Sequence, residues 1–445
     1  MFTCERIQRP IGIREHSQRP VLGHEHRPVR ARQATLGGRL RRFQNFIGLI
    51  REAHEYRIAL NLENSSGAAA GFAPARAGPP RSRYDQKLTE FQQRCHEIAA
   101  RLPELKADSF LVSSPANVRY LSGFSGSNGL MLLTAQEAHF FTDPRYAIEA
   151  AASISAKVHV VRGPLYGGAA AVIKRKRLKN IAFESANTLY EDYTKLQEAL
   201  PLGASLISAG KIVEERRMLK SESEIAIIRE SVQVNSVAYE RVLKRVRPGV
   251  REIDIAAEIE FQMKMLGAEK PSFDTIVAAG AKTASPHAHP GDRRLGKNEL
   301  LLIDMGASLR GYSSDMTRVA HLGRVSRRVQ VMYRAVLEAQ LAALDAVREG
   351  NTAGRVDAVA RKVLKKHKLD KAFVHSTGHG LGLEIHEIPR IGRKDPTVLQ
   401  AGMAVTIEPG AYVEGIGGIR IEDTVLVTRT GCEVLTPTSK EFVSL

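Results

Sequence analysis

The stretch LLLIDMGASLRGYSSDMTRVA, residues 300–320, decides how the second half of the chain folds. Its apolar run ends at Asp304, and Asp315 follows eleven residues later, beyond a turn near 309–311. This pattern predicts a tight antiparallel hairpin that brings the two aspartates nearly opposite one another. Two facing acids among apolar residues repel each other and are costly to bury unless a cation lies between them. The hairpin therefore predicts a cation site.

A second stretch, AVTIEPGAYVEGIGGIRIEDTV at residues 404–425, has the same organisation. Glu408 follows an apolar run, and Glu422 lies beyond the glycine-rich turn at 415–418. Arg420 shares the face of Glu422, because side chains at i and i+2 of a strand point the same way. Taken singly, each of the four acids is more typical of a solvated surface residue or a salt-bridge partner. Two matched pairs in matched places favour a shared metal site.

The elements predicted around these hairpins repeat once. Ser221 and Glu224 have capping-box spacing, which predicts a helix start, and Pro248 followed by glycine ends that helix. Two helices followed by strands, repeated, predict two similar halves that face each other across a site. The remaining predicted elements are a helix over 251–266, strands over 275–278, 299–307 and 312–322, helices over 327–348 and 353–367, and strands over 404–407 and 419–427.

Histidines gather in the glycine-rich segment FVHSTGHGLGLEIHE, residues 373–387. The spacing of His375 and His379 resembles the HExxH zinc helix, but Ser376 replaces the glutamate and the glycines disfavour a helix. A lone histidine here would be a hydrogen-bonded structural residue, whereas three of them, with His386, favour a site. His287, in SPHAHP, belongs to a second histidine group just before the first hairpin.

The candidate ligands form an oxygen-rich set that suits Mn²⁺ best, with Co²⁺, Fe²⁺ and Zn²⁺ as alternatives. We expect two ions, about 3.5–4 Å apart and bridged by carboxylates. The three cysteines are far apart and form no CxxC pair, which argues against a zinc knuckle and is typical of a reducing cytoplasm. The candidate ligands are Asp304, Asp315, His379, Glu408 and Glu422.

The N-terminal residues 1–83 differ from the rest of the chain. They hold 15 arginines, no lysine and six acidic residues, and so carry nine of the seventeen net positive charges. We interpret 1–83 as a disordered extension, or as a reading frame begun too far upstream, with folding expected near Tyr84. The rest shows no basic stripe interleaved with aromatics and no apolar run of about 20 residues, so we expect neither a nucleic-acid partner nor a membrane span.

A chain of 445 residues exceeds one ordinary core, so we expect two domains. In residues 84–215 short β-rich runs alternate with helical ones, which predicts an α/β domain. The predicted elements are helices over 86–101 and 189–200 and strands over 110–112, 129–134, 138–142, 158–161 and 180–183.

These motifs together resemble the pita-bread metallopeptidases, in the branch of the Xaa-Pro aminopeptidases and prolidases. In the first domain, NVRYLSGFSGSNG (117–129) and FTDPRY (141–146) are similar to the creatinase-type N-terminal domain, although Pro144 stands where the family more often has glycine. The other matching segments are IDMGA (303–307), SDMTR (314–318), HSTGHGLGLEIHE (375–387), IEPG (407–410) and GIRIEDTVLV (418–427).

The resemblance implies a fold, an assembly and a substrate. The fold is an α/β creatinase-like N-terminal domain over 84–215 plus an α+β pita-bread catalytic domain with two pseudo-symmetric halves over 216–445. The implied assembly is a homodimer, and the substrates are small peptides with proline second. The implied activity is that of an Xaa-Pro aminopeptidase, with Xaa-Pro dipeptidase (prolidase) as the alternative. A non-catalytic pita-bread binding module is the remote alternative, since such modules typically lose ligand residues.

The resemblance also implies a role for each site residue. A water bridging the two ions loses a proton to Glu408, which later passes one to the proline nitrogen, and the hydroxide attacks the carbonyl before proline. His386 and one ion stabilise the oxyanion. The resemblance implies that Asp304 binds one ion and that Asp315 and Glu422 bridge the two. His379 and Glu408 complete the ligands of the second ion. His287 and His375 position the proline side, and Arg420 supports the site behind Glu422.

Overall fold

The computed structural model describes residues 88–445. The extension predicted over 1–83 and the start of folding predicted near Tyr84 lie outside these residues. Across the described range, helices that are both long and apolar enough to cross a bilayer are absent.

The first domain is built on one mixed sheet of six strands, in the order β4-β3-β2-β1-β5-β6. Strand β1 pairs antiparallel with β2 and parallel with β5, so the sheet joins a meander to a parallel part. The strands predicted here are confirmed to within a residue, and β6 is added. Their bounds are β1 Ser109–Val112, β2 Gly129–Thr134, β3 Ala138–Thr142, β4 Lys157–Val160, β5 Asn180–Phe183 and β6 Ser205–Ser208.

Helices cover both faces of this sheet because its strands are apolar on both sides. Phe110 and Val112 pack with α2 and α3, whereas Leu111 between them packs with α5 and α6. Helix α2 begins after Thr89, which forms a capping box with Gln92. The helices are α2 Glu90–Ala99, α3 Pro115–Ser122, α4 Ala147–Ser153, α5 Leu165–Lys176, α6 Tyr190–Ala199 and α7 Ile212–Arg217.

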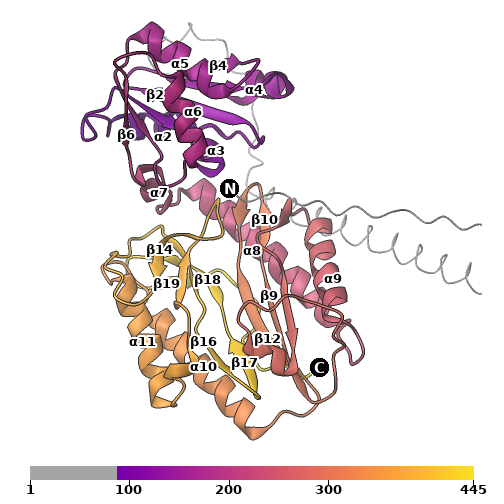
Figure 1. Cartoon of the computed structure of the whole chain (residues 1–445). Helices are drawn as coiled ribbons and strands as arrows, with labels where there is room; N and C mark the ends of the chain where they lie inside the picture. Colours follow the sequence, from indigo (N-terminus) through magenta and orange to yellow (C-terminus); the bar gives the residue numbers. More distant parts are fainter. Residues whose placement is uncertain (1–87) are drawn as a thin grey trace, which may run out of the picture. The chain divides into compact units, whose positions relative to one another are not determined.

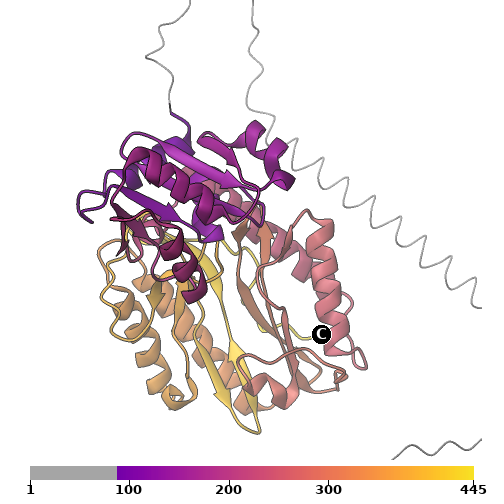
Figure 2. The same cartoon turned by 45° about the horizontal axis from the view of Figure 1, so that its top comes forward.

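The second domain repeats its order of elements, as predicted. Helices α8 (Glu222–Leu243) and α9 (Glu252–Met265) precede the sheet β12-β9-β8, and helices α10 (Arg327–Ala346) and α11 (Ala353–Lys366) precede the sheet β14-β13-β15-β18-β19. In both views α9 and α11 lie on opposite sides of the strands (Figures 1 and 2). The strands are β8 Ile276–Ala279, β9 Glu299–Met305, β12 Met316–Leu322, β13 Gly378–Gly380, β14 Glu387–Ile391, β15 Ala404–Ile407, β18 Asp423–Val427 and β19 Cys432–Val434.

Two small sheets complete the domain. One has the order β11-β10-β7, and the other is the hairpin β16-β17. The 3-10 turn η2 (Gly280–Ala284) carries the chain from β8 towards His287. The strands are β7 Lys270–Pro271, β10 Ala307–Leu309, β11 Tyr312–Ser313, β16 Gly410–Val413 and β17 Gly417–Arg420.

Three long strands predicted from the sequence are broken beside the acidic residues. The strand predicted over 299–307 stops at Met305, and β10 begins after Gly306. A side chain does not fit at Gly306, because a Cβ there would lie only 2.2 Å from the carbonyl oxygen of Ser314. The strand predicted over 312–322 divides into β11 and β12, and the one over 419–427 into β17 and β18. The breaks free Asp315 and Glu422 from the regular alternation of a strand.

The expected pairing of Asp304 with Asp315 is wrong in its register. Asp304 on β9 lies opposite Thr317 of β12, and Asp315 precedes that strand by one residue. The two-residue turn at Arg310 and Gly311 pairs Leu309 with Tyr312, and the same register continues to Asp304 and Thr317. The two carboxyl groups therefore approach each other diagonally.

Candidate metal centre

A cavity of about 700 Å³ in the second domain collects the residues predicted for the site. Its lining includes the five candidate ligands Asp304, Asp315, His379, Glu408 and Glu422, together with His287, His375, His386 and Arg420.

The candidate ligands lie on or beside five different strands. Because each is at or next to a strand, the backbone hydrogen bonds of the sheets fix its position. Asp304 is the penultimate residue of β9, Asp315 directly precedes β12, His379 is in the middle of β13, Glu408 directly follows β15, and Glu422 lies between β17 and β18.

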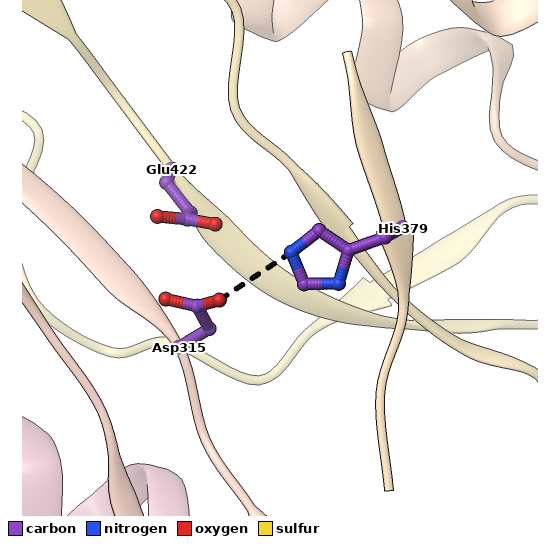
Figure 3. Close-up of side chains that lie close together, drawn as sticks. All are labelled: Asp315, His379 and Glu422. Carbon is purple, nitrogen blue, oxygen red and sulfur yellow. Dashed lines mark ion pairs between the residues drawn. The ribbon is translucent and has the colours of Figure 1, made fainter. Parts of the chain in front are cut away.

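His379 presents its Nε2 to the carboxylates. Its Nδ1 lies 3.0 Å from the carbonyl oxygen of Gly380, which can only accept, so Nδ1 carries the proton. Nε2 then has a free lone pair, 3.5 Å from Asp315 Oδ2 and 3.5 Å from Glu408 Oε1. Figure 3 shows His379, Asp315 and Glu422 pointing towards one another, with donor atoms that all lie within 4.8 Å. A single metal ion placed between these three side chains could bind a donor atom of each.

Arg420 holds Asp304 directly and Glu422 through an intermediate. Its Nη2 donates to Asp304 Oδ2 at 2.5 Å, and its Nη1 donates to the hydroxyl of Tyr412 at 2.6 Å. Its Nε donates to Thr317 Oγ1 at 3.0 Å, and that hydroxyl donates to Glu422 Oε2 at 2.6 Å. The sequence-based expectation placed Arg420 behind Glu422. Among residues 88–445 its direct carboxylate contact is with Asp304, and it reaches Glu422 through Thr317.

His375 is hydrogen-bonded at both ring nitrogens. Its Nδ1 donates to the carbonyl oxygen of Ser376 at 2.8 Å, so Nε2 accepts from the hydroxyl of Tyr412 at 2.9 Å. Burial, with the nearby cation of Arg420, lowers the pKa of His375 to about 4. His375 is therefore a neutral ring that orients Tyr412.

His386 and His287 differ from His375 because their rings are exposed in the cavity. The ring of His386 lies 4.3 Å from that of His379, centroid to centroid. Burial lowers the pKa of His386, followed in size by the effect of His379. Neither ring has a hydrogen-bond partner within residues 88–445, so their nitrogens remain available to a bound molecule.

The electrostatics of the cavity fit divalent cations. Burial raises the pKa of Asp315, Glu408 and Glu422, and the neighbouring Asp304 raises that of Asp315 further. One oxygen of Asp304 and one of Asp315, Oδ1 in each, are buried without a hydrogen-bond partner in the described part of the chain. Buried carboxylates that repel one another and keep free oxygens are suited to hard cations.

Sequence reasoning missed two residues of the site, Thr317 and Tyr412. Thr317 gave no signal, because a threonine within a strand is ordinary. A signal for Tyr412 was present in the glycine-rich turn, since a Cβ at Gly418 would lie 2.6 Å from the ring of Tyr412. The glycine opposite Tyr412 across the β16-β17 hairpin makes room for that ring.

Two similar halves that enclose four carboxylates and one histidine, behind an α/β domain, define a pita-bread metallohydrolase. The comparisons with known proteins name the family. Residues 226–429 match the model of metallopeptidase family M24, and residues 94–219 match the Creatinase/Prolidase N-terminal domain. The chain belongs to metallopeptidase family M24, which confirms the predicted fold and enzyme class.

The relatives cover nearly all of the described residues. The Xaa-Pro dipeptidase of Pyrococcus furiosus is 35% identical over 353 residues, which is 79% of this chain and 100% of that protein. The structure of an Xaa-Pro dipeptidase from Bacillus anthracis has a TM-score of 0.78 at 36% identity, covering 80% of this chain and 100% of that one. The X-Pro aminopeptidase from Thermotoga maritima has a TM-score of 0.73 at 32% identity, with coverages of 78% and 100%.

Proposed function

We propose that this chain is a metal-dependent peptidase that hydrolyses the bond between an N-terminal residue and proline. The observation that carries the proposal is the meeting of His379 Nε2 with the carboxylates of Asp315 and Glu422 inside one cavity. Its support from outside the chain is that similar proteins of family M24 are named Xaa-Pro dipeptidase and X-Pro aminopeptidase.

The candidate ligands would hold two divalent ions, which supply a water of lowered pKa and polarise the substrate carbonyl. Within that frame, Glu408 is the group that accepts a proton and returns it to the leaving proline nitrogen. Its side chain is 16% exposed at the cavity wall, and its Oε1 lies beside His379 Nε2. A carboxylate that reaches both the ligands and the cavity suits this transfer.

The rest of the cavity suits a proline substrate. A bond to proline has no N–H, so recognition rests on the shape of the ring and on carbonyl contacts. Phe273 and Ile276 supply apolar surface, and His386 and His287 supply ring nitrogens that can hydrogen-bond a substrate carbonyl. His375 has both ring nitrogens engaged, so its role is to hold the hydroxyl of Tyr412, which accepts from Arg420.

Arg390 favours a dipeptide substrate. It lines the same cavity, and its guanidinium has no carboxylate partner among residues 88–445. The free carboxylate of a C-terminal proline would form a charge-assisted pair with it, whereas a longer peptide places a neutral amide there. This observation favours the Xaa-Pro dipeptidase alternative over the aminopeptidase interpretation.

A comparison of three peptides tests both levels of the proposal. With Mn²⁺ present, we expect hydrolysis of Ala-Pro, at least about tenfold lower kcat/KM for Ala-Pro-Ala, and no cleavage of Ala-Ala. The variant Arg390→Leu should remove the preference for Ala-Pro over Ala-Pro-Ala. Equal rates on the first two peptides in the unmodified chain would make it an aminopeptidase. Absence of hydrolysis of every Xaa-Pro peptide would refute the function.

Four further properties belong to the same proposal. We expect manganese to be the activating ion, because the donor set is mainly carboxylate. Free thiols at Cys95, which is buried, and Cys432, which is half-buried, suit a cytoplasmic protein. We also expect a homodimer and place the boundary between the domains near residue 216. Metal activation profiles and the mass in solution by light scattering test the metal and the assembly.

A further inference from the structure

The loop that carries His386, residues 381–387, connects β13 to β14 in the second domain but packs against the first domain. Leu383 lies against the hydrophobic cluster formed by α2, α3 and the first sheet, which includes Cys95 and Tyr120. Leu381 is fully buried in a separate small cluster with Ile228 of α8. The loop is therefore held from two sides, by the two domains.

A buried ion cluster anchors the end of this loop. Arg217, at the last position of α7, places Nη2 within 2.5 Å of Glu387 Oε1 and 2.8 Å of Glu384 Oε2. Lys220 Nζ donates to the other oxygen of Glu387 at 3.0 Å. The side chains of Arg217 and Lys220 are each 2% exposed and that of Glu387 is 5% exposed.

The cluster extends from Arg217 into the first domain. Arg217 Nη1 donates to Asn117 Oδ1 at 2.7 Å, and Asn117 Nδ2 donates to Glu184 Oε1 at 2.6 Å. Glu184 is itself fixed by the backbone N–H groups of Ser113 and Ser114 at 2.6 and 2.7 Å. A continuous line of buried hydrogen bonds thus joins the end of the first sheet to Glu387.

We propose that Arg217 and Glu387 are positioning residues through which the first domain sets the place of His386. Glu387 follows His386 directly. If it turned outward, the buried Lys220 would lose its carboxylate partner and Arg217 would keep only the half-exposed Glu384, which is costly. The backbone of His386 is therefore fixed by a contact with the first domain, while its ring stays free in the cavity. This inference rests on the proposed function for its kinetic consequence, and on geometry alone for its structural one.

Conservative variants test the proposal while they keep a polar side chain at each position of the buried cluster. In Arg217→Lys the charge remains but the fork that reaches both Glu387 and Asn117 is lost. We expect kcat on Ala-Pro to fall about 10- to 100-fold with KM and bound metal little changed, because the histidine is displaced while the ligands are not. Glu387→Gln should show the same split.

The neighbouring arginine is the matched control. Arg216 pairs with Glu97 at 2.6 Å and its side chain is 42% exposed, so Arg216→Lys should leave kcat unchanged. In a His386→Ala background, Arg217→Lys should cost no further activity, because both changes act on the same group. The proposal would be overturned if the activity losses of Arg217→Lys and His386→Ala multiplied in the double variant. It would also be overturned if Arg217→Lys lost its bound metal.

A readout without turnover separates this inference from the proposed function. In metal-free protein labelled with ¹⁵N-histidine, the His386 signal is assigned by its loss in His386→Gln. That signal should move or broaden in Arg217→Lys and stay in place in Arg216→Lys. An unmoved signal in Arg217→Lys refutes the inference even if Ala-Pro is hydrolysed, and a moved signal supports it even if Ala-Pro is not.

Discussion

At the scale of single residues, the hydrogen bond on one atom of a side chain decides what the neighbouring atom can do. His379 uses Nδ1 for the carbonyl of Gly380, so Nε2 faces the carboxylates. Asp304 uses Oδ2 for Arg420, and its Oδ1 has no hydrogen-bond partner within residues 88–445. These hydrogen bonds orient the donor atoms of the candidate ligands. Groups that hydrogen-bond to metal ligands generally have this function.

Removal of the Glu408 carboxylate tests its role in proton transfer. Glu408→Gln keeps the size of the side chain but cannot take up a proton, so kcat on Ala-Pro should fall by about 10²- to 10⁴-fold. Glu414, exposed in the turn between β16 and β17, provides the control Glu414→Gln, which should retain full activity. Metal content is measured on both proteins. Full activity in Glu408→Gln with its metal retained would show that another group moves the proton.

The sequence predicted the site residues unevenly, and the reason is physical. Acids that abut apolar strands are exceptional, because burial without a partner is costly, so Asp304 and Glu422 could be predicted from their neighbours. Thr317 and Tyr412 are ordinary strand residues whose roles arise only when Arg420 lies between them. Their contribution depends on contacts across the fold, which no local pattern encodes.

At the scale of elements, the helices could be predicted well where caps and apolar periodicity agree. Helix α8 begins after Ser221 with the predicted capping box, although it ends at Leu243, several residues before the proline. Helix α5 was not predicted, because its sequence LYGGAAAVIKRK has two glycines near its start and a basic end. The long strands were predicted as continuous, since their breaks depend on close backbone approaches such as that of Gly306 to Ser314.

One such close approach fixes the strand of His379. A Cβ at Gly378 would lie 1.9 Å from the carbonyl oxygen of Thr406 on β15. Gly378→Ala should force these strands apart, cost about 1–3 kcal/mol of unfolding free energy and reduce metal affinity. Gly431→Ala is the control, because nothing lies within 4 Å of its Cβ position. Thermal unfolding and metal titration measure both effects, and an unchanged midpoint in Gly378→Ala would contradict the argument.

The pair of strands β3 and β4 should make the stability of the first domain depend on pH. His139 Nδ1 lies 2.9 Å from His159 Nε2. Glu137 pairs with His139 and also with Lys157 and Lys176. Arg175 is a further charge near His159. Burial lowers the pKa of both histidines below the ordinary 6.5. The unfolded chain then binds more protons as the pH falls through 6.5, so stability is lost below that pH and is fully present above it.

The variant His159→Gln measures this effect. In metal-free protein, the midpoint of His159→Gln should rise relative to that of the unmodified chain as the pH falls from 7.5 to 5.5, because the variant lacks one histidine of lowered pKa. His96→Gln, at an exposed position of α2, should leave the pH dependence as it was. An equal pH dependence in all three proteins would remove the histidine pair as its cause.

At the scale of the whole molecule, the buried carboxylates link metal binding to the stability of both halves of the second domain. Asp315 comes from the first half and Glu422 from the second. Burial raises the pKa of both, and Asp315 raises that of Glu422 further. A cation between them stabilises the folded chain by about 2.7 kcal/mol when its free concentration is 100 times the dissociation constant. A metal held by Asp315 and Glu422 would therefore link the two halves as well as supply chemistry.

Asp315→Asn should separate these two effects. The variant loses a ligand, so Mn²⁺ should no longer raise its unfolding midpoint. Without metal, its midpoint should equal or exceed that of the unmodified chain, because one of the mutually repelling charges is gone. Asp345→Asn, at an exposed position of α10, should keep the metal-induced shift. A shift retained in Asp315→Asn would exclude Asp315 from the metal shell.

The contact of Leu383 with the first domain decides which residues must be exchanged together when chimeras are made between this chain and its relatives. A chimera cut between the domains would join a foreign hydrophobic cluster to the native loop 381–387 and leave Leu383 against a surface shaped for another side chain. The block that can be exchanged is therefore discontinuous in sequence: the first domain together with that loop. Hybrid enzymes assembled from this block should keep a working cavity, whereas hybrids that follow the domain boundary alone should inherit a displaced histidine.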